Sequence, residues 1–418
     1  MKDAHQFDIA VVGAGPAGLV AGLACAASGL KTAVIGPRAD AADGRVAALL
    51  NGSINVIKRL GLWETIEPVA APLTGIRLVD ATDHIFRAPE VLFDASEIDL
   101  PAFGYNVANS DLTRALEAAA ETRLARITTR AVTSFESTDS GAFLTTADGE
   151  TVTASLVAAA DGRNSFIRRY AGIPVTDWSY PQIAVVTSFA HPRPHNGVST
   201  ELHRPSGPLT VVPGPGNTSS LVWVETPREA ERLLRLDDDG FIRALNTHIA
   251  PLLGPISALA PRRSYPLSGQ TAMRFGKGCV VLIGEAGHVV PPIGAQGLNL
   301  GFRDAAALAE IAAAARSGGS AIGAPETVDR YDRSRRADVA SRVFAVNLLN
   351  RSLLTSFPGV NLARGAGLAA LAASRTLRQQ AMREGVSPSL APLMLTAPIA
   401  AGVGKAAPGL DAPSPSRA

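Results

Sequence analysis

Residues 7–35, FDIAVVGAGPAGLVAGLACAASGLKTAVI, decide the fold of this chain. Residues 7–12 form an apolar strand pattern, an Ala/Leu-rich helical pattern covers residues 19–28, and residues 31–35 form a second apolar strand pattern. The turn after the first strand, GAGPAG at residues 13–18, has the GxGxxG spacing. We therefore predict a βαβ unit that opens an α/β domain for a dinucleotide.

Each glycine of the turn has a separate physical task. Gly13 permits the tight turn, Gly15 lets a pyrophosphate approach the backbone, and Gly18 lets the helix pack closely on the strand. The helix N-terminus carries roughly half a positive charge, which contributes about 0.3–1 kcal/mol to the binding of an anion. We predict that the cofactor contacts Gly13, Gly15, Pro16, Ala17 and Gly18.

The second strand lacks the acidic residue that commonly holds the ribose hydroxyls. It ends at Ile35-Gly36, and Pro37-Arg38 follow. Arg38 could meet a 2′-phosphate or stack on adenine, and a 2′-phosphate would indicate NADP.

Composition excludes several classes of function. The chain has 39 basic and 37 acidic residues and no basic run with interleaved aromatics, so nothing indicates nucleic acid. Its two cysteines, Cys25 and Cys279, lie in apolar runs, which favours buried free thiols and a reducing compartment.

Two uncharged segments could be mistaken for membrane elements. Residues 9–30 contain five glycines and a proline and follow acidic residues, so neither a signal peptide nor a spanning helix fits. Residues 385–404 are broken by three prolines. They are either an irregular packed tail or a contact with a membrane surface.

The middle of the chain continues the α/β pattern. Asn109-Ser110-Asp111 predicts a helix start, with Ser110 or Asp111 as N-cap, and the helix runs to about Ala125. Strand patterns cover residues 127–135, 142–146, 151–154 and 156–160. The last strand ends at Asp161-Gly162-Arg163, a position where open α/β sheets place ligand contacts.

From Ile183 to about Tyr265 the pattern changes to alternating strands with Pro/Gly turns. We predict an antiparallel sheet with strands at 183–189, 199–203, 209–212 and 219–225, and helices at 227–236 and 240–249. Further helices are predicted at 325–354 and 362–384, and the Pro/Ala/Ser-rich tail 387–418 ends in disorder.

The stretch Gly278–Glu310 carries the second ligand signal. Residues 279–283 predict a buried strand, the Gly/Pro-rich loop 284–297 follows, and a helix begins at Leu298. Such a loop aims several backbone N–H groups at one place, which suits an anion or an electron-rich ring. The alternative is a connection that binds nothing.

Three motifs in this order resemble the single-component FAD-dependent aromatic hydroxylases: Gly13–Gly18, Asp161-Gly162-Arg163, and Gly284-Glu285-Ala286-Gly287-His288. The continuation HVVPPIGAQGLNLGFRDAAALAE, residues 288–310, resembles the ubiquinone-biosynthesis hydroxylases of the UbiH/UbiF type. The resemblance covers roughly residues 7–384.

The resemblance implies an α/β fold with a Rossmann-like FAD-binding domain, an inserted, mostly antiparallel substrate domain like that of hydroxybenzoate hydroxylase, and C-terminal helices. The expected boundaries are 1–75, 103–178 and 272–345 for the FAD-binding domain, 76–102 and 179–271 for the substrate domain, 346–386 for the C-terminal helical region and 387–418 for the tail.

The resemblance also assigns cofactor contacts. Arg45 and Asn109 would lie along the pyrophosphate and ribityl chain, Val132 would meet adenine through its backbone, and Asp161 would serve FAD and the approach of NAD(P)H. Glu285 replaces the family's Asp at a ribityl hydroxyl, which lengthens that side chain by one methylene. The loop would contribute Gly284 and would wrap the isoalloxazine with Pro291, Pro292, Gly294, Gly297, Leu298 and Asn299.

The implied chemistry resides mainly in the cofactor. In the family, NADH or NADPH reduces FAD, O2 adds at the flavin C4a position, and the hydroperoxide oxygenates an activated ring. The sequence shows no metal-ligand spacing, and it names no acid or base with confidence. The loop candidates near the flavin are His288, Pro291 and Pro292. His288 is either a proton carrier or a histidine bonded to backbone.

The leading hypothesis is a hydroxylase of a polyprenylated phenol or quinol in ubiquinone synthesis, with a hydrophobic aromatic substrate. One rival is a hydroxylase of a soluble phenol. Another is a catalytically silent FAD-binding partner of a biosynthetic complex, and a third is a plain NADP-dependent dehydrogenase. The resemblance favours a cytoplasmic protein at the inner membrane face or in a quinone-biosynthesis complex, and it allows a homodimer. The ring position, the tail length and the choice between NADH and NADPH stay open.

Overall fold

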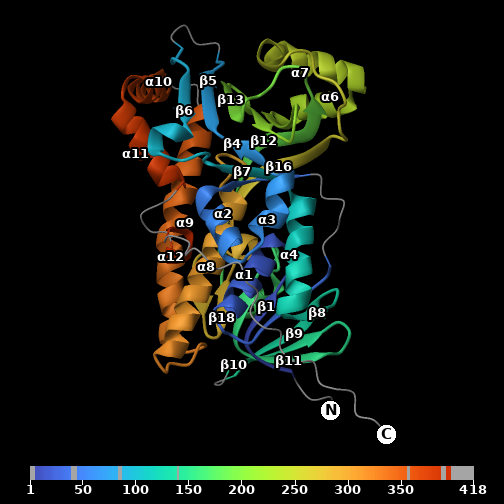
Figure 1. Cartoon of the computed structure of the whole chain (residues 1–418), viewed down its shortest axis with the longest axis vertical. Helices are drawn as coiled ribbons and strands as arrows, with labels where there is room; N and C mark the ends of the chain where they lie inside the picture. Colours follow the sequence, from blue (N-terminus) through green and yellow to red (C-terminus); the bar gives the residue numbers. More distant parts are fainter. Residues whose placement is uncertain are drawn as a thin grey trace.

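The computed structural model describes residues 5–38, 45–82, 87–138, 141–354, 358–386 and 392–396. Most of the tail, including the part predicted to be disordered, lies outside these ranges. Figure 1 shows an α/β body, a second sheet with its own helices above it, and C-terminal helices along one side.

The α/β body contains a sheet with the strand order β17-β18-β11-β1-β2-β8. Strand β1 (His5–Val12) is parallel to β11 (Thr151–Ala159) and to β2 (Thr32–Gly36). Outside them, β18 (Val280–Leu282) is parallel to β11, and β8 (Ala125–Thr128) is parallel to β2. The antiparallel strands are β9 (Val132–Thr138), β10 (Gly141–Thr146) and β17 (Gly276–Lys277). Because parallel strands end at the same edge, the turns after β1, β2, β11 and β18 meet there.

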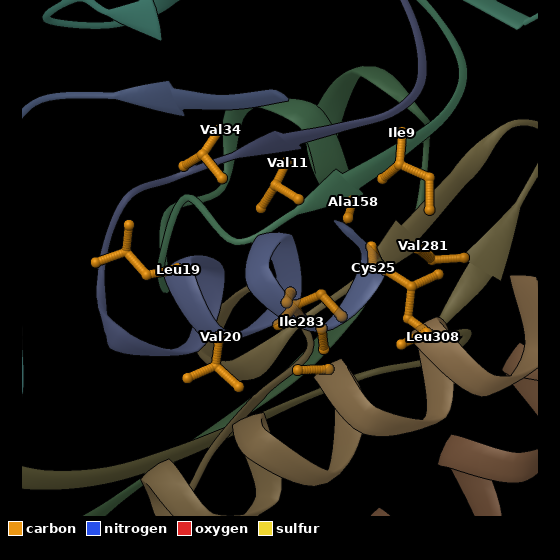
Figure 2. Close-up of a cluster of buried hydrophobic side chains, with 14 of the residues drawn as sticks. Ile9, Val11, Leu19, Val20, Cys25, Val34, Ala158, Val281, Ile283 and Leu308 are labelled. Carbon is orange, nitrogen blue, oxygen red and sulfur yellow. The ribbon is translucent and has the colours of Figure 1, made fainter. Parts of the chain in front are cut away.

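Helix α1 (Pro16–Ala27) is almost entirely enclosed. Eight of its twelve residues are buried, and Figure 2 shows Cys25 beside Val281 of β18 and Leu308 of α8 (Gln296–Ser317). Both cysteines are buried free thiols, as predicted, and burial raises the pKa of Cys25 to about 12. The uncharged run 9–30 is therefore core. Within the described ranges, every helix is too short or too polar to cross a bilayer.

The second sheet has the strand order β19-β16-β12-β15-β14-β13-β5-β6, and its neighbours are antiparallel except for β13 and β5. Helices α6 (Pro227–Arg235) and α7 (Asp238–Leu253) cover one face through a buried apolar cluster. Its strands are β5 (Gly75–Asp80), β6 (Val91–Asp94), β12 (Val175–Ala190), β13 (Val198–Arg204), β14 (Gly207–Pro213), β15 (Thr218–Glu225), β16 (Arg263–Ala272) and β19 (His288–Val289).

A small three-stranded sheet joins the two parts (Figure 1). In the order β3 (Val46–Leu50), β7 (Gly104–Ala108), β4 (Ala71–Leu73), it is flanked by α2 (Asn51–Arg59) and α3 (Trp63–Ile66). Asn106 Nδ2 donates to the carbonyl of Pro213 in β14 at 3.0 Å. The smaller turns are 3-10 helices: η1 (Glu67–Val69), η2 (Ala95–Ile98) and η3 (Gly284–Ala286).

The C-terminal helices are α9 (Pro325–Leu354), α10 (Pro358–Ala373), α11 (Arg375–Val386) and α12 (Leu393–Thr396). The bounds predicted for α9 are confirmed, and the helical region predicted at 362–384 consists of two helices, α10 and α11. It breaks at Ser374, whose hydroxyl accepts from the amide of Leu377 at 3.3 Å and so opens α11.

Three smaller predictions are wrong. The strand predicted at 127–135 is two strands, β8 and β9, because the first pairs with β2 and the second with β10. The strands predicted at 151–154 and 156–160 are one, β11, which β1 accompanies along its length. Helix α4 (Asn109–Arg123) has Ala108 as N-cap, so Ser110 and Asp111 lie inside it.

Candidate functional site

The turn after β1 has the geometry that its glycines predict. Gly13 has φ +116°, and a Cβ there would lie 2.1 Å from the carbonyl oxygen of Ala160. A Cβ at Gly18 would lie 2.0 Å from the carbonyl oxygen of Gly13. A Cβ at Gly15 would meet no described atom within 4 Å. Two glycines therefore permit close packing, and the third leaves open space over the turn.

Two helix N-termini flank this space. Helix α1 begins at Pro16 after Gly15, and α8 begins at Gln296 after Ala295, which has φ 55°. Neither start is capped by a side chain of the described residues. The two starts are close, because a Cβ at Gly301 would lie 3.0 Å from the Cβ of Ala17. Their free N–H groups suit a negatively charged ligand.

The turn after β18 is arranged differently. The amide of Gly284 already donates to Asp304 Oδ2 at 2.8 Å, and a Cβ at Gly284 would lie 3.3 Å from that of Ala17. Gly284 therefore packs the turn against α1. Glu285 is exposed, and its carboxylate accepts no hydrogen bond from the described residues. Farther along the loop, Pro291 is buried, whereas Pro292, Gly294 and Gly297 are exposed.

Asn299 fastens the start of α8 to β3 and α2. Its Oδ1 accepts from the amide of Leu50 at 2.9 Å and from the hydroxyl of Ser53 at 2.6 Å. Its Nδ2 donates to the carbonyls of Ala48 and Ala295 at 2.7 and 2.6 Å. Since the side chain of Asn299 is committed to these bonds, only its backbone remains for a ligand.

The structure brings Arg45 and Asn109 together. The amide of Asn109, at the start of α4, donates to the carbonyl of Arg45 at 2.9 Å. Val132 is buried at the start of β9. The chain just before it lies at the end of β2, because the amide of Thr129 donates to the carbonyl of Gly36 at 3.3 Å. The predicted contacts to phosphate and adenine therefore lie near the same edge of the sheet.

The end of β2 is held by a residue that the sequence did not single out. Arg126 donates to the carbonyls of Gly36 and Pro37 at 3.0 and 2.9 Å. Arg38 is exposed, and its Nη1 lies 2.6 Å from Glu121 Oε1. An acid at this distance disfavours a 2′-phosphate beside Arg38.

Asp161 closes β11 and begins α5 (Phe166–Tyr170). Its carboxylate accepts from the hydroxyl of Ser165 at 2.5 Å and from the amide of Phe166 at 2.7 Å. Two arginines of this segment donate hydrogen bonds to other parts of the fold. Arg168 is buried and donates to the carbonyl of Ala286 at 2.7 Å, and Arg163 donates to Ser268 of β16 at 2.6 Å. Burial lowers the pKa of Arg168. Asp161 thus fixes the position of this turn in the site.

A buried ionic network lies behind the turn after β18. Asp304 Oδ2 lies 2.7 Å from His288 Nε2, and Asp304 Oδ1 accepts from Arg335 Nε at 2.6 Å. Arg335 also pairs with Asp338, which pairs with Arg303. Burial alone raises the pKa of Asp304, but Arg335, His288 and the Gly284 amide together lower it to about 2. Asp304 is therefore ionised at neutral pH.

The alternative in which His288 is bonded to backbone is wrong. His288 is 1 % exposed, and its Nε2 lies 2.7 Å from Oδ2 of Asp304. The sequence carried a signal for this network: Arg303 and Asp304 interrupt the Ala/Leu run of α8, and charges in a buried run need partners. It could not name Arg335, because α9 meets α8 only in the folded chain.

These features fit FAD. The open space over Gly15 and the uncapped N-terminus of α1 suit a pyrophosphate, and the exposed loop glycines and the uncapped N-terminus of α8 suit an isoalloxazine. The unpartnered carboxylate of Glu285 is available to a hydroxyl group.

Comparison with known proteins supports this assignment. The FAD binding domain model matches residues 6–346. Ubiquinone hydroxylase UbiL of Rhodospirillum rubrum is 34 % identical over 388 residues, 90 % of this chain and 88 % of that protein. The 3-demethoxyubiquinol 3-hydroxylase of Escherichia coli is 30 % identical over 386 residues, 90 % and 97 % of the two chains.

Solved structures share the fold. The p-nitrophenol 4-monooxygenase PnpA of Pseudomonas putida DLL-E4 has a TM-score of 0.73 at 19 % identity and covers 91 % of this chain and 98 % of that one. PqsL of P. aeruginosa, in complex with 2-aminobenzoylacetate, has a TM-score of 0.71 at 21 % identity, with coverages of 88 % and 100 %. The predicted family and fold class are confirmed, and the plain NADP-dependent dehydrogenase is excluded. The chain belongs to the FAD binding domain family, as an FAD-dependent monooxygenase.

Proposed function

We propose that this protein hydroxylates the aromatic ring of a polyprenylated phenol or quinol intermediate of ubiquinone synthesis. The observation that carries the proposal is its likeness, over 90 % of the chain, to a ubiquinone hydroxylase and to a 3-demethoxyubiquinol 3-hydroxylase. FAD, when bound, supplies the transfer of one oxygen atom from O2, with NADH or NADPH as the source of electrons.

The face of the second sheet opposite α6 and α7 supports a hydrophobic substrate. Its buried cluster consists of Tyr180, Ala184, Val224 and Leu267, with Trp178, Val186, Val222 and Leu354 packed against it. None of these side chains carries a charge. A substrate that approached this face with an uncharged ring and an apolar tail would avoid the cost of burying a benzoate carboxylate.

The described residues would hold the cofactor at both ends. The Gly13–Gly18 turn and the N-terminus of α1 would bind the pyrophosphate, with Arg45 and Asn109 alongside and the backbone of Val132 at adenine. Backbone N–H groups at the start of α8 would stabilise negative charge at the other end.

Two acidic residues have different proposed roles. Glu285, which is exposed, would accept from a hydroxyl group of the cofactor. Asp161 holds the turn that NAD(P)H would approach. His288 is buried and bonded to Asp304, so its proposed role is to hold the loop in place and not to carry a proton.

The test compares two substrates on the FAD-loaded protein. We expect NAD(P)H oxidation with a short-tailed prenylated quinol to give a product that has gained one oxygen atom, labelled when the reaction runs under 18O2. We expect kcat/KM for this substrate to exceed that for 4-hydroxybenzoate by at least about tenfold, because burial of an unpaired charge costs several kcal/mol.

Two rival functions give different results. Faster turnover of the soluble phenol would favour a hydroxylase of soluble substrates. Bound FAD that neither coenzyme reduces would favour a silent partner of a biosynthetic complex. In cells, deletion of the gene should cause an under-hydroxylated quinone precursor to accumulate, measured by mass spectrometry, and an unchanged quinone profile would contradict the proposal.

A further inference from the structure

Helix α10 has its polarity reversed relative to an ordinary surface helix. Its polar residues, Asn361 and Arg364, are partly buried, and Arg364 Nη1 donates inward to the carbonyl of Ser352 in α9 at 2.6 Å. Its exposed positions are all apolar or glycine: Gly359, Val360, Leu362, Ala363, Ala366, Gly367, Ala369, Ala370 and Ala373. We call these nine residues the α10 face. Leu362 is 72 % exposed. The other large side chain of the face is Val360, which is 37 % exposed, and the remaining seven residues are alanine or glycine, so the face is apolar along its whole length.

Positive charge is concentrated in the segment of the chain that contains this face. Residues 341–386 contain six arginines and one acid, Glu384, whereas the whole chain has 39 basic and 37 acidic residues. Glu384 pairs with Arg342, and Arg378 pairs with Glu97. Arg351, Arg375 and Arg383 are exposed, and none of the three forms an ion pair with an acidic side chain of the described residues. The surroundings of the α10 face therefore attract anions.

We propose that the α10 face binds the surface of an anionic lipid bilayer. Apolar side chains would enter the boundary of the acyl chains while the neighbouring arginines meet the headgroups, as in interfacial helices. A second copy of this chain is a poorer occupant, because a two-fold contact would bring arginines against arginines. Figure 1 shows α10 at the edge of the molecule, beside the second sheet.

The preceding helix has exposed apolar side chains of its own. Phe344 and Leu348 lie one turn apart on α9 and are 68 % and 59 % exposed. The use of the surface rests on the proposed function, since a substrate with a lipid tail would be reached from the bilayer. Binding itself does not rest on it.

Flotation with vesicles tests the inference on the FAD-loaded full chain. We expect the protein to float with phosphatidylcholine vesicles that contain about 30 mol % phosphatidylglycerol, and to float less with phosphatidylcholine alone or at high salt. Leu362→Glu with Ala366→Glu should lower the bound fraction at least about tenfold. Met273→Glu is the matched control, because Met273 is 56 % exposed outside this region, and it should bind like the unmodified chain.

A second variant covers the case in which the first misfolds. Arg375→Glu with Arg383→Glu changes only exposed positions and should weaken binding to anionic vesicles while FAD content stays unchanged. Equal flotation of the Leu362/Ala366 variant and the unmodified chain, or no flotation of the unmodified chain, overturns the inference. Light scattering that shows a dimer split by the same substitutions would assign the face to a second copy and would also overturn it.

The reaction of a short-tailed soluble quinol separates this inference from the proposed function. The Leu362/Ala366 variant should turn it over at the rate of the unmodified chain, since the face lies outside the cofactor site. Flotation without any turnover would support the bilayer contact and contradict the hydroxylase.

Discussion

The turns after β1 and after β18 solve the same problem in different ways. Both end a parallel strand at one edge of the sheet, and both lead to a helix whose start lacks a capping side chain from the described residues. The first turn is short and is built from glycines that meet nearby backbone. The second is long, and its shape depends on Asp304, His288 and Arg335, which come from three separate elements.

The difference shows which residues determine the shape of each turn. A steric requirement such as that at Gly13 is satisfied by a residue and its immediate surroundings. The second turn depends on an ionic network with charged members on α8 and α9. The loss of any one member can therefore disrupt the turn. The first turn should therefore be sensitive to added volume and the second to lost charge.

Asp304→Ala should cause the largest loss. It would leave Arg335 buried without the carboxylate that accepts from its Nε, and it would free the amide of Gly284. We expect a loss of about 3–5 kcal/mol in the free energy of unfolding, with loss of FAD. Denaturant unfolding and flavin absorbance measure both. Asp329→Ala removes an exposed pair with Arg274 from the same part of the fold and should cost no more than about 1 kcal/mol. Similar losses for the two variants would contradict the importance of the buried network.

Gly13→Ala should cost nearly as much, for a steric reason. The new Cβ would lie 2.1 Å from the carbonyl oxygen of Ala160, at a φ of +116° that other residues rarely adopt. We expect the FAD-free protein to lose about 3 kcal/mol of unfolding free energy. Unchanged stability with unchanged FAD affinity would show that the turn does not need its glycine.

Acid should weaken the second turn before the first. The pKa of Asp304 in the folded protein is about 2, below the ordinary value of 3.8 for an aspartate, so the unfolded chain binds the proton more readily. The stabilisation is present above about pH 4 and is lost as pH falls toward 2; it amounts to about 2–3 kcal/mol at roughly 1.4 kcal/mol per pKa unit. Urea unfolding at a series of pH values should show this slope, and Asp304→Asn should reduce it. Equal pH dependence in the unmodified chain and the Asp304→Asn variant would show that a group other than Asp304 titrates.

Gly15→Ala should have the smallest effect on stability and a clear effect on cofactor. No described atom lies within 4 Å of the added methyl, and Gly15 has an ordinary φ of −72°. We expect the FAD-free protein to lose about 1 kcal/mol or less, whereas FAD affinity falls about tenfold because the methyl occupies the phosphate position. Calorimetric titration with FAD measures the affinity. An unaffected affinity would move the pyrophosphate away from this turn.

Local patterns were enough to predict the βαβ unit, the antiparallel second sheet and the bounds of α9. Each of these follows from periodicity and glycine position within a short stretch. The ties of Asn299 to Leu50 and Ser53, and of Arg126 to Gly36 and Pro37, could not be predicted. They join residues that are distant in sequence, and side chains of the same type are common on solvated surfaces.

The strand order of the parallel sheet bears on when this protein can be assembled. Strand β1 leaves the ribosome long before β18, which lies two strands away from it in the sheet and begins only at Val280. At about 5–20 residues per second, the N-terminal strand waits on the order of 15–50 s for that neighbour. Until then the apolar side of α1 has no α8 to cover it, so a nascent chain would depend on chaperones during that interval, and flavin could be captured only after most of the polypeptide has been made.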